Sequence, residues 1–201
     1  IEIGTSKVWD FAEEFDLAKV VVVNGIDIEN AQYEPILENL KTTFGARFFP
    51  INIPTNPGPG YSEMLDVIRK AKLTYKTDGS GKYDEAKATG EEGEQVDQLH
   101  TELIELVAES DDTLLEKFFD EGITEDELRG GLHKAFQSRT FIPVFFTSSE
   151  TNVGVARLMD FISKYASSPD DHMETVAQNA DGEEVTISLD DNEAAAFVFK
   201  T

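Results

Sequence analysis

Two continuous apolar runs are the clearest pattern along the chain, and each of them ends in polar residues. Residues 20–23 are four valines followed by Asn-Gly-Ile-Asp at 24–27, and residues 141–146 are mostly aromatic and branched, followed by Thr-Ser-Ser at 147–149. An apolar run without polar alternation predicts a strand buried on both faces, as in a parallel sheet covered by helices. Because ligands of open α/β sheets bind beyond the carboxyl ends of the strands, both polar segments are candidate binding segments.

Helical periodicity is the second pattern, and it appears in five segments whose apolar stripes we expect to face the core. Local signals predict some of the helix ends. Thr5-Ser6 and Ser110 are expected N-caps, Thr124 with Glu127 has the pattern of a capping box that begins a further helix, and Gly45 is expected to end a helix in a left-handed conformation. The stripes are Val8, Phe11, Ala12 and Phe15; Tyr33, Ile36, Leu37, Leu40 and Phe44; Val96, Leu99, Leu103, Leu106 and Val107; Leu114, Leu115, Phe118 and Phe119; and Val155, Leu158, Met159, Ile162 and Tyr165.

The remaining segments are strand-like or form loops. Residues 47–76 have a strand pattern that is interrupted at 55–60, where Thr-Asn-Pro-Gly-Pro-Gly cannot continue a strand. An acidic stretch follows Pro169 and contains one alternating segment, 185–189, which predicts a short hairpin strand. Residues 197–201 also have the pattern of a strand.

The chemistry of the first polar segment depends on two side chains. Asn24 and Asp27 can present an amide and a carboxylate to a planar ligand, and the carboxylate can accept two hydrogen bonds at once. Guanine offers that donor pair through N1–H and its 2-amino group. The alternative is structural, because Asn and Asp are also ordinary turn residues after a strand.

The order of elements resembles the later part of a translational GTPase, specifically elongation factor G. Asn24 and Asp27 match that family's guanine-reading motif Asn-Lys-x-Asp, and residues 147–149 match its later Gly-Ser-Ala motif. The likeness runs nearly from end to end. Further matches in the same order are Ile53-Pro54, residues 65–68, Lys70-Ala71, 103–105, 115–118, 124–128, Pro143-Val144, Gly154-Val155, 165–169 and 197–201.

The resemblance implies an α/β fold, a truncated P-loop GTPase-type parallel sheet with an inserted α+β subdomain. Residues 1–46 and 140–168 would be the second half of the GTPase domain, 47–139 the inserted subdomain, and 169–201 an acidic linker with the first strand or strands of the following β domain. It also implies a guanine nucleotide site formed by Asn24, Asp27, Ser148 and Ser149, with GTP or GDP and Mg²⁺ bound in the full-length parent protein.

Two positions depart from the family pattern. Gly25 stands where the family has a lysine whose aliphatic stem covers the base, so that packing is absent here. Ser149 stands where the family has alanine, a milder change because the family uses the backbone N–H there to donate to guanine O6. These departures indicate a divergent paralogue and leave open a weakened or lost preference for guanine.

A phosphate-binding loop of the form Gly-x-x-x-x-Gly-Lys-Ser/Thr does not occur in the 201 residues. The nearest segment, 78–83, lacks the first glycine and the Ser/Thr after lysine, so we expect a hairpin or surface loop. By resemblance, the phosphate loop, both switches and the catalytic histidine would lie upstream of Ile1, in a longer GTPase. We assign no catalytic residue, and expect this segment alone neither to hydrolyse GTP nor to bind nucleotide tightly.

Charge limits the choice of partners. The chain has a net charge of −23, and residues 84–128 hold 17 Asp or Glu against two Lys. This acidity argues against direct nucleic-acid binding, because phosphate contacts need Lys and Arg. The acidic run is either a solvated helical face or a surface that steers a basic protein. The resemblance implies the ribosome as partner, with the ribosomal stalk protein contacted through the inserted subdomain.

Other sites have little support in the sequence. The chain contains no cysteine, so it has no disulfide or thiolate metal site, and His100, His133 and His172 share no ligand spacing for zinc. No apolar run is long enough for a membrane span, and the resemblance implies a cytoplasmic protein. Two functions remain open. One is the base-reading segment of a ribosome-associated GTPase, and the alternative is a degenerate nucleotide site that serves as an acidic protein-interaction module.

Overall fold

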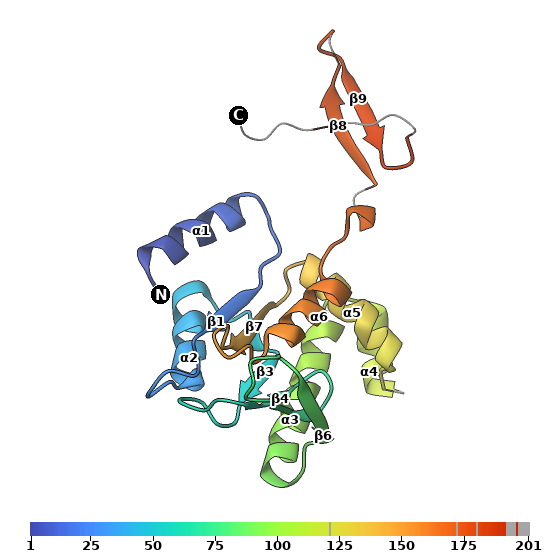
Figure 1. Ribbon diagram of the computed structural model, residues 1–201. Helices are drawn as coiled ribbons and strands as arrows, with labels where there is room; N and C mark the ends of the chain where they lie inside the picture. The colour runs from blue at the N-terminus through green and yellow to red at the C-terminus, as the bar shows by residue number, and fades with distance from the viewer. Residues whose placement is uncertain (121, 172, 180, 192–195, 197–201) are drawn as a thin grey trace. The chain divides into compact units, whose positions relative to one another are not determined.

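A computed structural model describes residues 1–120, 122–171, 173–179, 181–191 and 196, with the side chains of residues 112, 119, 120 and 125 outside the description. The chain divides into two compact units, residues 1–166 and 167–201, and each is described by itself (Figure 1).

The first unit is built on a short parallel sheet. Strands β1 (Val21–Asn24), β7 (Ile142–Thr147) and β2 (Phe48–Pro50) lie in the order β1-β7-β2, and both pairings are parallel. Each parallel connection passes through a helix, as parallel pairing requires. The predicted α/β fold with a parallel sheet is therefore confirmed.

Burial differs between the two apolar runs. All six residues of β7 are buried, as its central position in the sheet demands. β1 is an edge strand whose residues alternate between half-buried and exposed, and Val22 is 42% exposed. The prediction that residues 20–23 are buried on both faces was wrong, because the described elements leave the face that carries Val22 uncovered.

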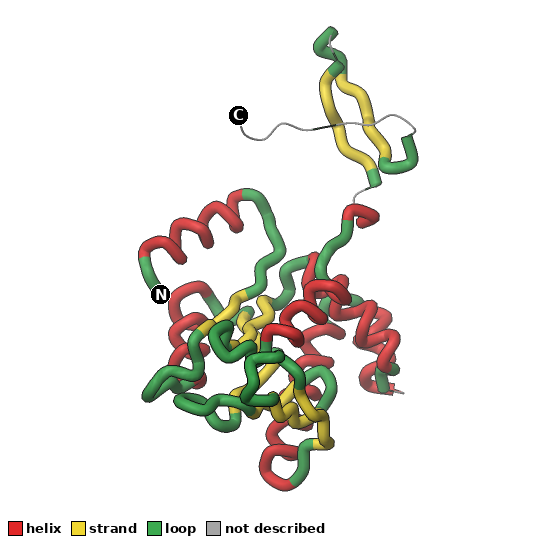
Figure 2. Tube along the Cα trace, viewed as in Figure 1, coloured by secondary structure: helices red, strands yellow, loops and turns green. Residues whose placement is uncertain are grey.

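A second, antiparallel sheet follows β2. Its strands are β3 (Asn52–Pro54), β4 (Glu63–Asp66), β5 (Ala71–Tyr75) and β6 (Tyr83–Lys87), in the order β3-β4-β5-β6 (Figure 2). The predicted loop at 55–60 separates β3 from β4. Residues 78–83 lie in and beside the β5–β6 hairpin connection, which confirms them as a hairpin loop.

Strand β2 lies within the range 47–139 that we expected for the inserted segment. We expected the insertion to begin at residue 47, but Phe48–Pro50 pairs with β7 in the parallel sheet. The backbone then passes directly into the antiparallel sheet, and the N–H of Ile51 still donates to the carbonyl of Val144 at 2.9 Å. The two sheets are therefore joined through one residue.

Three consecutive helices follow β6: α3 (Gly90–Ala108), α4 (Asp112–Asp120) and α5 (Glu125–Gln137). Helix α3 contacts β4, α4 and α5, and α5 contacts the later helix α6 (Val155–Tyr165). The predicted capping box of α5 is present, because the Thr124 side chain accepts from the Glu127 N–H while Glu127 accepts from the Thr124 N–H. Ser110 is not the cap of α4; Asp111 accepts from the Thr113 N–H instead.

Strand β7 separates two hydrophobic clusters through the alternation of its side chains. Phe141 and Phe145 face a cluster with helices α3, α5 and α6, whereas Ile142, Val144 and Phe146 face a cluster with β4, β5 and helix α2 (Tyr33–Phe44). The α3 stripe behaves as predicted, with Val96, Leu103 and Val107 fully buried.

Two buried polar contacts connect the sheets and helices. The Asn52 side chain donates to the Phe146 carbonyl at 3.0 Å and accepts from the Phe146 N–H at 2.8 Å. These are the two hydrogen bonds that a neighbouring strand would otherwise form with Phe146 of β7. Arg157 on α6 forms an ion pair with Asp66 at the end of β4, with Nε and Oδ2 2.6 Å apart and side chains only 6% and 2% exposed. Arg157 also reaches Asp160 at 2.6 Å.

Helix α1 (Ile3–Glu14) does not follow the prediction. It starts before the expected cap at Thr5-Ser6, and no residue in it is buried. Val8, Phe11 and Phe15, expected in the core, are 68%, 61% and 68% exposed. Its Trp9 ring stacks on Phe44 of α2 with centroids 4.4 Å apart and lies 5.5 Å from the ring of Phe48 in β2.

Helices α2 and α6 agree with prediction only in part. Helix α2 ends at Gly45, whose φ of 105° requires glycine, although its ψ of 171° is extended and not left-handed helical. In α6, Met159 and Ile162 are 59% and 43% exposed, whereas Arg157 lies on the buried face. The ion pair with Asp66 explains this inversion of the expected stripe.

In the second unit, β8 (Glu174–Gln178) and β9 (Glu184–Ser188) form an antiparallel hairpin, which confirms the strand expected at 185–189. A short 3₁₀ helix, η1 (Pro169–Asp171), precedes the hairpin. The strand expected at 197–201 lies outside the described residues.

We predict that Arg157→Met lowers the free energy of unfolding by about 3 kcal/mol or more, because it leaves the Asp66 carboxylate buried without its partner. Lys76→Met removes the same charge from the exposed ion pair with Asp84 and should cost less than about 1 kcal/mol. Urea denaturation of both variants measures the difference. Equal losses of unfolding free energy would show that the buried pair stabilises the fold no more than the exposed pair does.

We also predict an acid-dependent loss of stability at the start of α5. The Lys117 ammonium and the Thr124 N–H and hydroxyl lower the pKa of Glu127 to about 2. This pKa is lower than in the unfolded chain, so the stabilisation is complete above about pH 5 and disappears as the pH falls from about 4.5 towards 2. Glu127→Gln should flatten that part of the stability profile, measured by thermal unfolding at a series of pH values, whereas an unchanged profile would refute the coupling.

Candidate functional site

Asn24 links the carboxyl ends of β1 and β7. Its side-chain amide donates to the Ser149 hydroxyl at 3.0 Å, and its side-chain oxygen accepts the Ser149 N–H at 2.9 Å. The Thr147 hydroxyl donates to the same oxygen at 3.4 Å. Two of the residues predicted from the sequence, Asn24 and Ser149, are therefore in direct contact although 125 positions separate them.

Backbone hydrogen bonds hold the turn between Asn24 and Asp27. The N–H groups of Gly25 and Ile26 both donate to the Thr147 carbonyl, at 2.9 and 3.2 Å. On the other side, the Ile26 carbonyl accepts the N–H of Gly58 at 2.8 Å, and the Ile26 side chain is buried. The turn is thus fixed both to β7 and to the 55–60 loop, which orients the Asp27 side chain.

Asp27 is half-buried and makes no hydrogen bond or ion pair with any residue that the structure describes. Its two carboxylate oxygens are therefore open to an external donor pair. The Tyr61 hydroxyl is buried, and no partner for it occurs within the described part of the chain. Burial raises the pKa of Tyr61, and the neighbouring Tyr75 and Asp27 raise it further, so Tyr61 stays neutral.

The two serines of the second segment differ in position. Ser148 is fully buried, its hydroxyl accepts the Thr151 N–H at 3.2 Å, and its backbone pairs with Val153 in both directions. Ser149 is exposed. Ser148 therefore holds the loop in place, and Ser149 is the residue that faces outward.

The Ser149 N–H already has an acceptor within the protein. The resemblance assigns this group to guanine O6, but here it donates to Asn24. A base could receive this donor only by sharing the hydrogen bond or by displacing the Asn24 oxygen. Such competition weakens any base contact at this position.

Gly25 has a φ of +86°, in the region that L residues rarely adopt. A Cβ atom there would meet no atom closer than the Ile28 Cγ2 at 4.0 Å, so the conformation and not space favours glycine.

A hollow of about 370 Å³ lies beside Gly25, and Asp27, Ser148 and Ser149 do not line this hollow. Its walls include Val23, Asn24, Gly25, Ile26, Ile28, Ala31, Pro35 and Ile36.

Sequence reasoning missed several contributors to this site. The Thr147 carbonyl and the Gly58 N–H act through the backbone, so no side-chain pattern identifies them. The Tyr61 ring is a buried core residue whose proximity to Asp27 depends on the path of the 55–60 loop.

Other chemistry finds no support in the described parts of the chain. No three His, Cys, Asp or Glu residues gather there in a way that could hold a metal ion. None of the described helices combines the length and apolar character that a membrane crossing requires.

Comparison with known proteins decides the family. The family model described as "Elongation factor Tu GTP binding domain" matches residues 1–168. The chain belongs to this family. It is a GTP-binding domain of translation-factor type, and its α/β architecture is of the P-loop GTPase type.

A solved structure supports the same relationship. A crystal structure of a Thermus thermophilus protein superposes on this domain with a TM-score of 0.76 at 30% sequence identity. The match covers 88% of this chain and 26% of that chain, so the present chain spans about a quarter of the length of that relative. Full-length members of the elongation factor Tu-type family bind GTP or GDP with Mg²⁺.

In this elongation factor Tu-type domain, Gly25→Lys should lower the free energy of unfolding by about 1–2 kcal/mol, because lysine is strained at a φ of +86°. Gly4→Lys is the matched control, since Gly4 lies in α1 with nothing within 4 Å and without a positive φ. The control should be neutral or slightly stabilising, because glycine is a poor helix former. A urea titration measures both, and a fully stable Gly25→Lys variant would mean that the turn relaxes.

Proposed function

We propose that this chain supplies the base-reading edge of an elongation factor G-like ribosomal GTPase, with Asn24, Asp27, Ser148 and Ser149 around the guanine base. The observation that carries the proposal is the contact of Asn24 with Ser149 and Thr147, which aligns the two polar segments beside the free Asp27 carboxylate.

Each residue has a distinct role in this proposal. Asp27 accepts the N1–H and 2-amino group of guanine, a charge-assisted pair of hydrogen bonds. Asn24 positions the two segments, and Ser148 anchors the second loop through the Thr151 N–H. Ser149 offers its N–H to O6 in exchange for its bond to Asn24.

The phosphates and Mg²⁺ need residues that this sequence does not contain, since it has no Gly-x-x-x-x-Gly-Lys-Ser/Thr loop. The exposed apolar residues of α1 and the free edge of β1 support the view that further GTPase elements pack there. Most of the affinity for nucleotide then comes from those elements, and this chain alone binds guanine nucleotides weakly.

The antiparallel sheet and helices α3 to α5 form the inserted subdomain in this proposal. With their strongly acidic sequence, they are the surface that we assign to the ribosome, through a basic region of the stalk protein. The same charge disfavours direct nucleic-acid contacts, and the assignment places the protein in the cytoplasm.

The alternative is a degenerate nucleotide site in an acidic interaction module. Two observations favour it: Gly25 provides no cover for a base, and the Ser149 N–H already has an acceptor. The two functions differ in one measurable property, which is selectivity for guanine over other bases.

We therefore predict that this chain binds GDP with an affinity far weaker than micromolar, yet distinguishes guanosine from adenosine in NMR titrations of the residues around Asn24. Asp27→Asn should weaken the binding of guanosine at least tenfold, because a hydrogen bond to a charged group contributes roughly 1.5–3 kcal/mol. The same variant should bind xanthosine better than the native chain, since the new amide donates to the carbonyl at position 2 of xanthine.

Asp78→Asn is the control for charge, because Asp78 lies in the β5–β6 hairpin loop, outside the candidate site, and accepts a hydrogen bond from the N–H of its neighbour Ser80. It should leave guanosine binding unchanged. Equal binding of guanosine and adenosine by the native chain would instead support the interaction module, and submicromolar GDP binding would contradict the assignment of phosphate contacts to other elements.

A further inference from the structure

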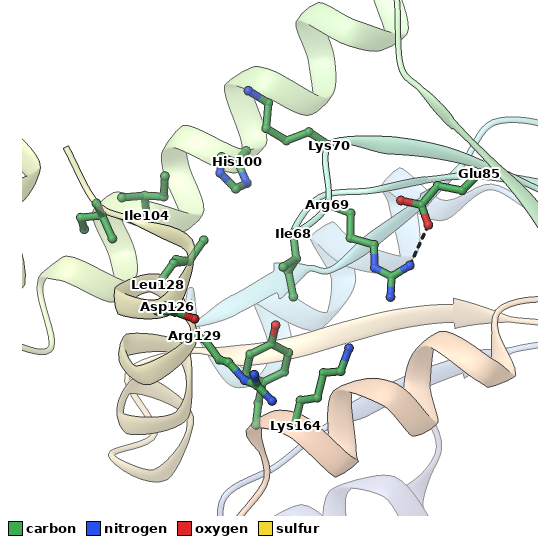
Figure 3. A pocket seen from close by; sticks show the side chains of 12 residues that line it. Ile68, Arg69, Lys70, Glu85, His100, Ile104, Asp126, Leu128, Arg129 and Lys164 are labelled. Carbon is green, nitrogen blue, oxygen red and sulfur yellow. Dashed lines mark hydrogen bonds and ion pairs between the residues drawn. The ribbon is translucent and has the colours of Figure 1, made fainter.

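A second hollow opens between the β4–β5 turn and helices α3, α5 and α6. It has a volume of about 500 Å³ and shares no lining residue with the candidate guanine site (Figure 3). We call it the cationic cleft. Its lining residues are Ile68, Arg69, Lys70, Glu85, His100, Ile104, Ile123, Asp126, Leu128, Arg129, Lys164 and Tyr165.

The charges in this cleft oppose the charge of the protein. The chain has only 17 Lys and Arg against 40 Asp and Glu, yet four of those cations line this hollow against two carboxylates. Arg69 is neutralised by Glu85 at 2.7 Å and by Asp160 at 3.5 Å. Lys70 is neutralised by Asp97 at 2.6 Å.

The other two cations have no such partner. Arg129 on α5 and Lys164 on α6 form no ion pair with any residue in the described parts of the chain, and Figure 3 shows them reaching the cleft from different helices. Asp126 is also without an ion pair there, so its charge opposes an anion in the cleft. Among the described residues, two cations and one carboxylate of the lining therefore have no ion-pair partner.

One neutral donor, the Tyr165 hydroxyl, belongs to the same lining as these cations. The Tyr165 side chain is 9% exposed, and its hydroxyl makes no hydrogen bond with the described residues. Burial raises the pKa of Tyr165, and the positive charges of Arg157 and Arg129 act against that rise. The His100 Nδ1 lies 2.8 Å from the Val67 carbonyl and must donate to it, so the ring orientation is fixed.

The remaining wall of the cleft is apolar. Ile68, Ile104 and Leu128 line it together with the Tyr165 ring. A ligand that only carried charge would leave this wall in contact with water. An aromatic or alkyl group attached to the anion would instead be buried against it.

We propose that the cationic cleft binds a phosphate monoester carrying an apolar or aromatic group. The phosphate has a charge between about −1.5 and −2 at neutral pH, and Arg129 and Lys164 supply two positive charges against the single unpaired carboxylate of Asp126. Arginine provides a planar pair of donors for phosphate oxygens, lysine a point charge, and the Tyr165 hydroxyl a further donor. The ester group packs on Ile68, Ile104 and Leu128.

The probe for this site is phenyl phosphate, titrated into the chain and followed by NMR and calorimetry. We expect binding that shifts the resonances of Arg129, Lys164 and Tyr165 and not those of Asn24 or Asp27. Phenyl phosphate should bind at least several-fold more tightly than inorganic phosphate. Equal affinities would refute the role of the apolar wall.

Single substitutions test the charges. Arg129→Met and Lys164→Met should each lower the affinity for phenyl phosphate roughly tenfold. Lys41→Met removes the same charge from α2, outside the cleft, and should change the affinity less than twofold. Equal losses in all three variants would show a general charge effect and overturn the proposal.

Asp126→Asn provides a test in the opposite direction. It removes the carboxylate that opposes the anion, so phenyl phosphate should bind several-fold more tightly.

A phosphotyrosine peptide distinguishes two sources of the phosphate ester, a phosphorylated protein and a small metabolite. Tighter binding than phenyl phosphate indicates a phosphorylated protein, and weaker binding indicates a small phosphorylated metabolite, whereas no binding of any phosphate ester refutes the site.

Discussion

The burial of strand β7 is the constraint on which the rest of the first unit depends. Because every residue of β7 is buried, both of its edges and both of its faces need partners. β1 and β2 pair with its edges, and the Asn52 amide continues the hydrogen bonding where β2 has ended. Its alternating side chains divide the apolar residues into two clusters, so one strand organises both the parallel sheet and the antiparallel sheet.

The same strand positions the candidate guanine site. The Thr147 carbonyl at its end accepts two N–H groups from the turn after β1, and the following residues contact Asn24. Asp27 is thereby oriented without any direct bond of its own to the described residues. Backbone hydrogen bonds therefore hold the turn that carries Asp27.

Electrostatics in this protein follows from its excess of carboxylates. With 40 acidic residues and 17 Lys and Arg, most described cations are engaged, as in the buried Asp66–Arg157 pair that joins β4 to α6. A cation that remains unpaired under these conditions is therefore informative. Arg129 and Lys164 differ from the other unpaired cations of the described residues because both line one hollow, together with Arg69 and Lys70.

The sequence alone determined the types of most elements and the two polar segments. Continuous apolar runs, helical stripes and the Thr124–Glu127 capping box depend on local spacing, which the chain carries in itself. Tertiary structure decided burial. Val22 and Phe11 are as apolar as core residues yet lie exposed, because burial requires a neighbour that a local pattern cannot reveal. Arg157 and Asn52 are polar yet buried, because each meets one distant partner that only the folded chain brings within hydrogen-bonding distance.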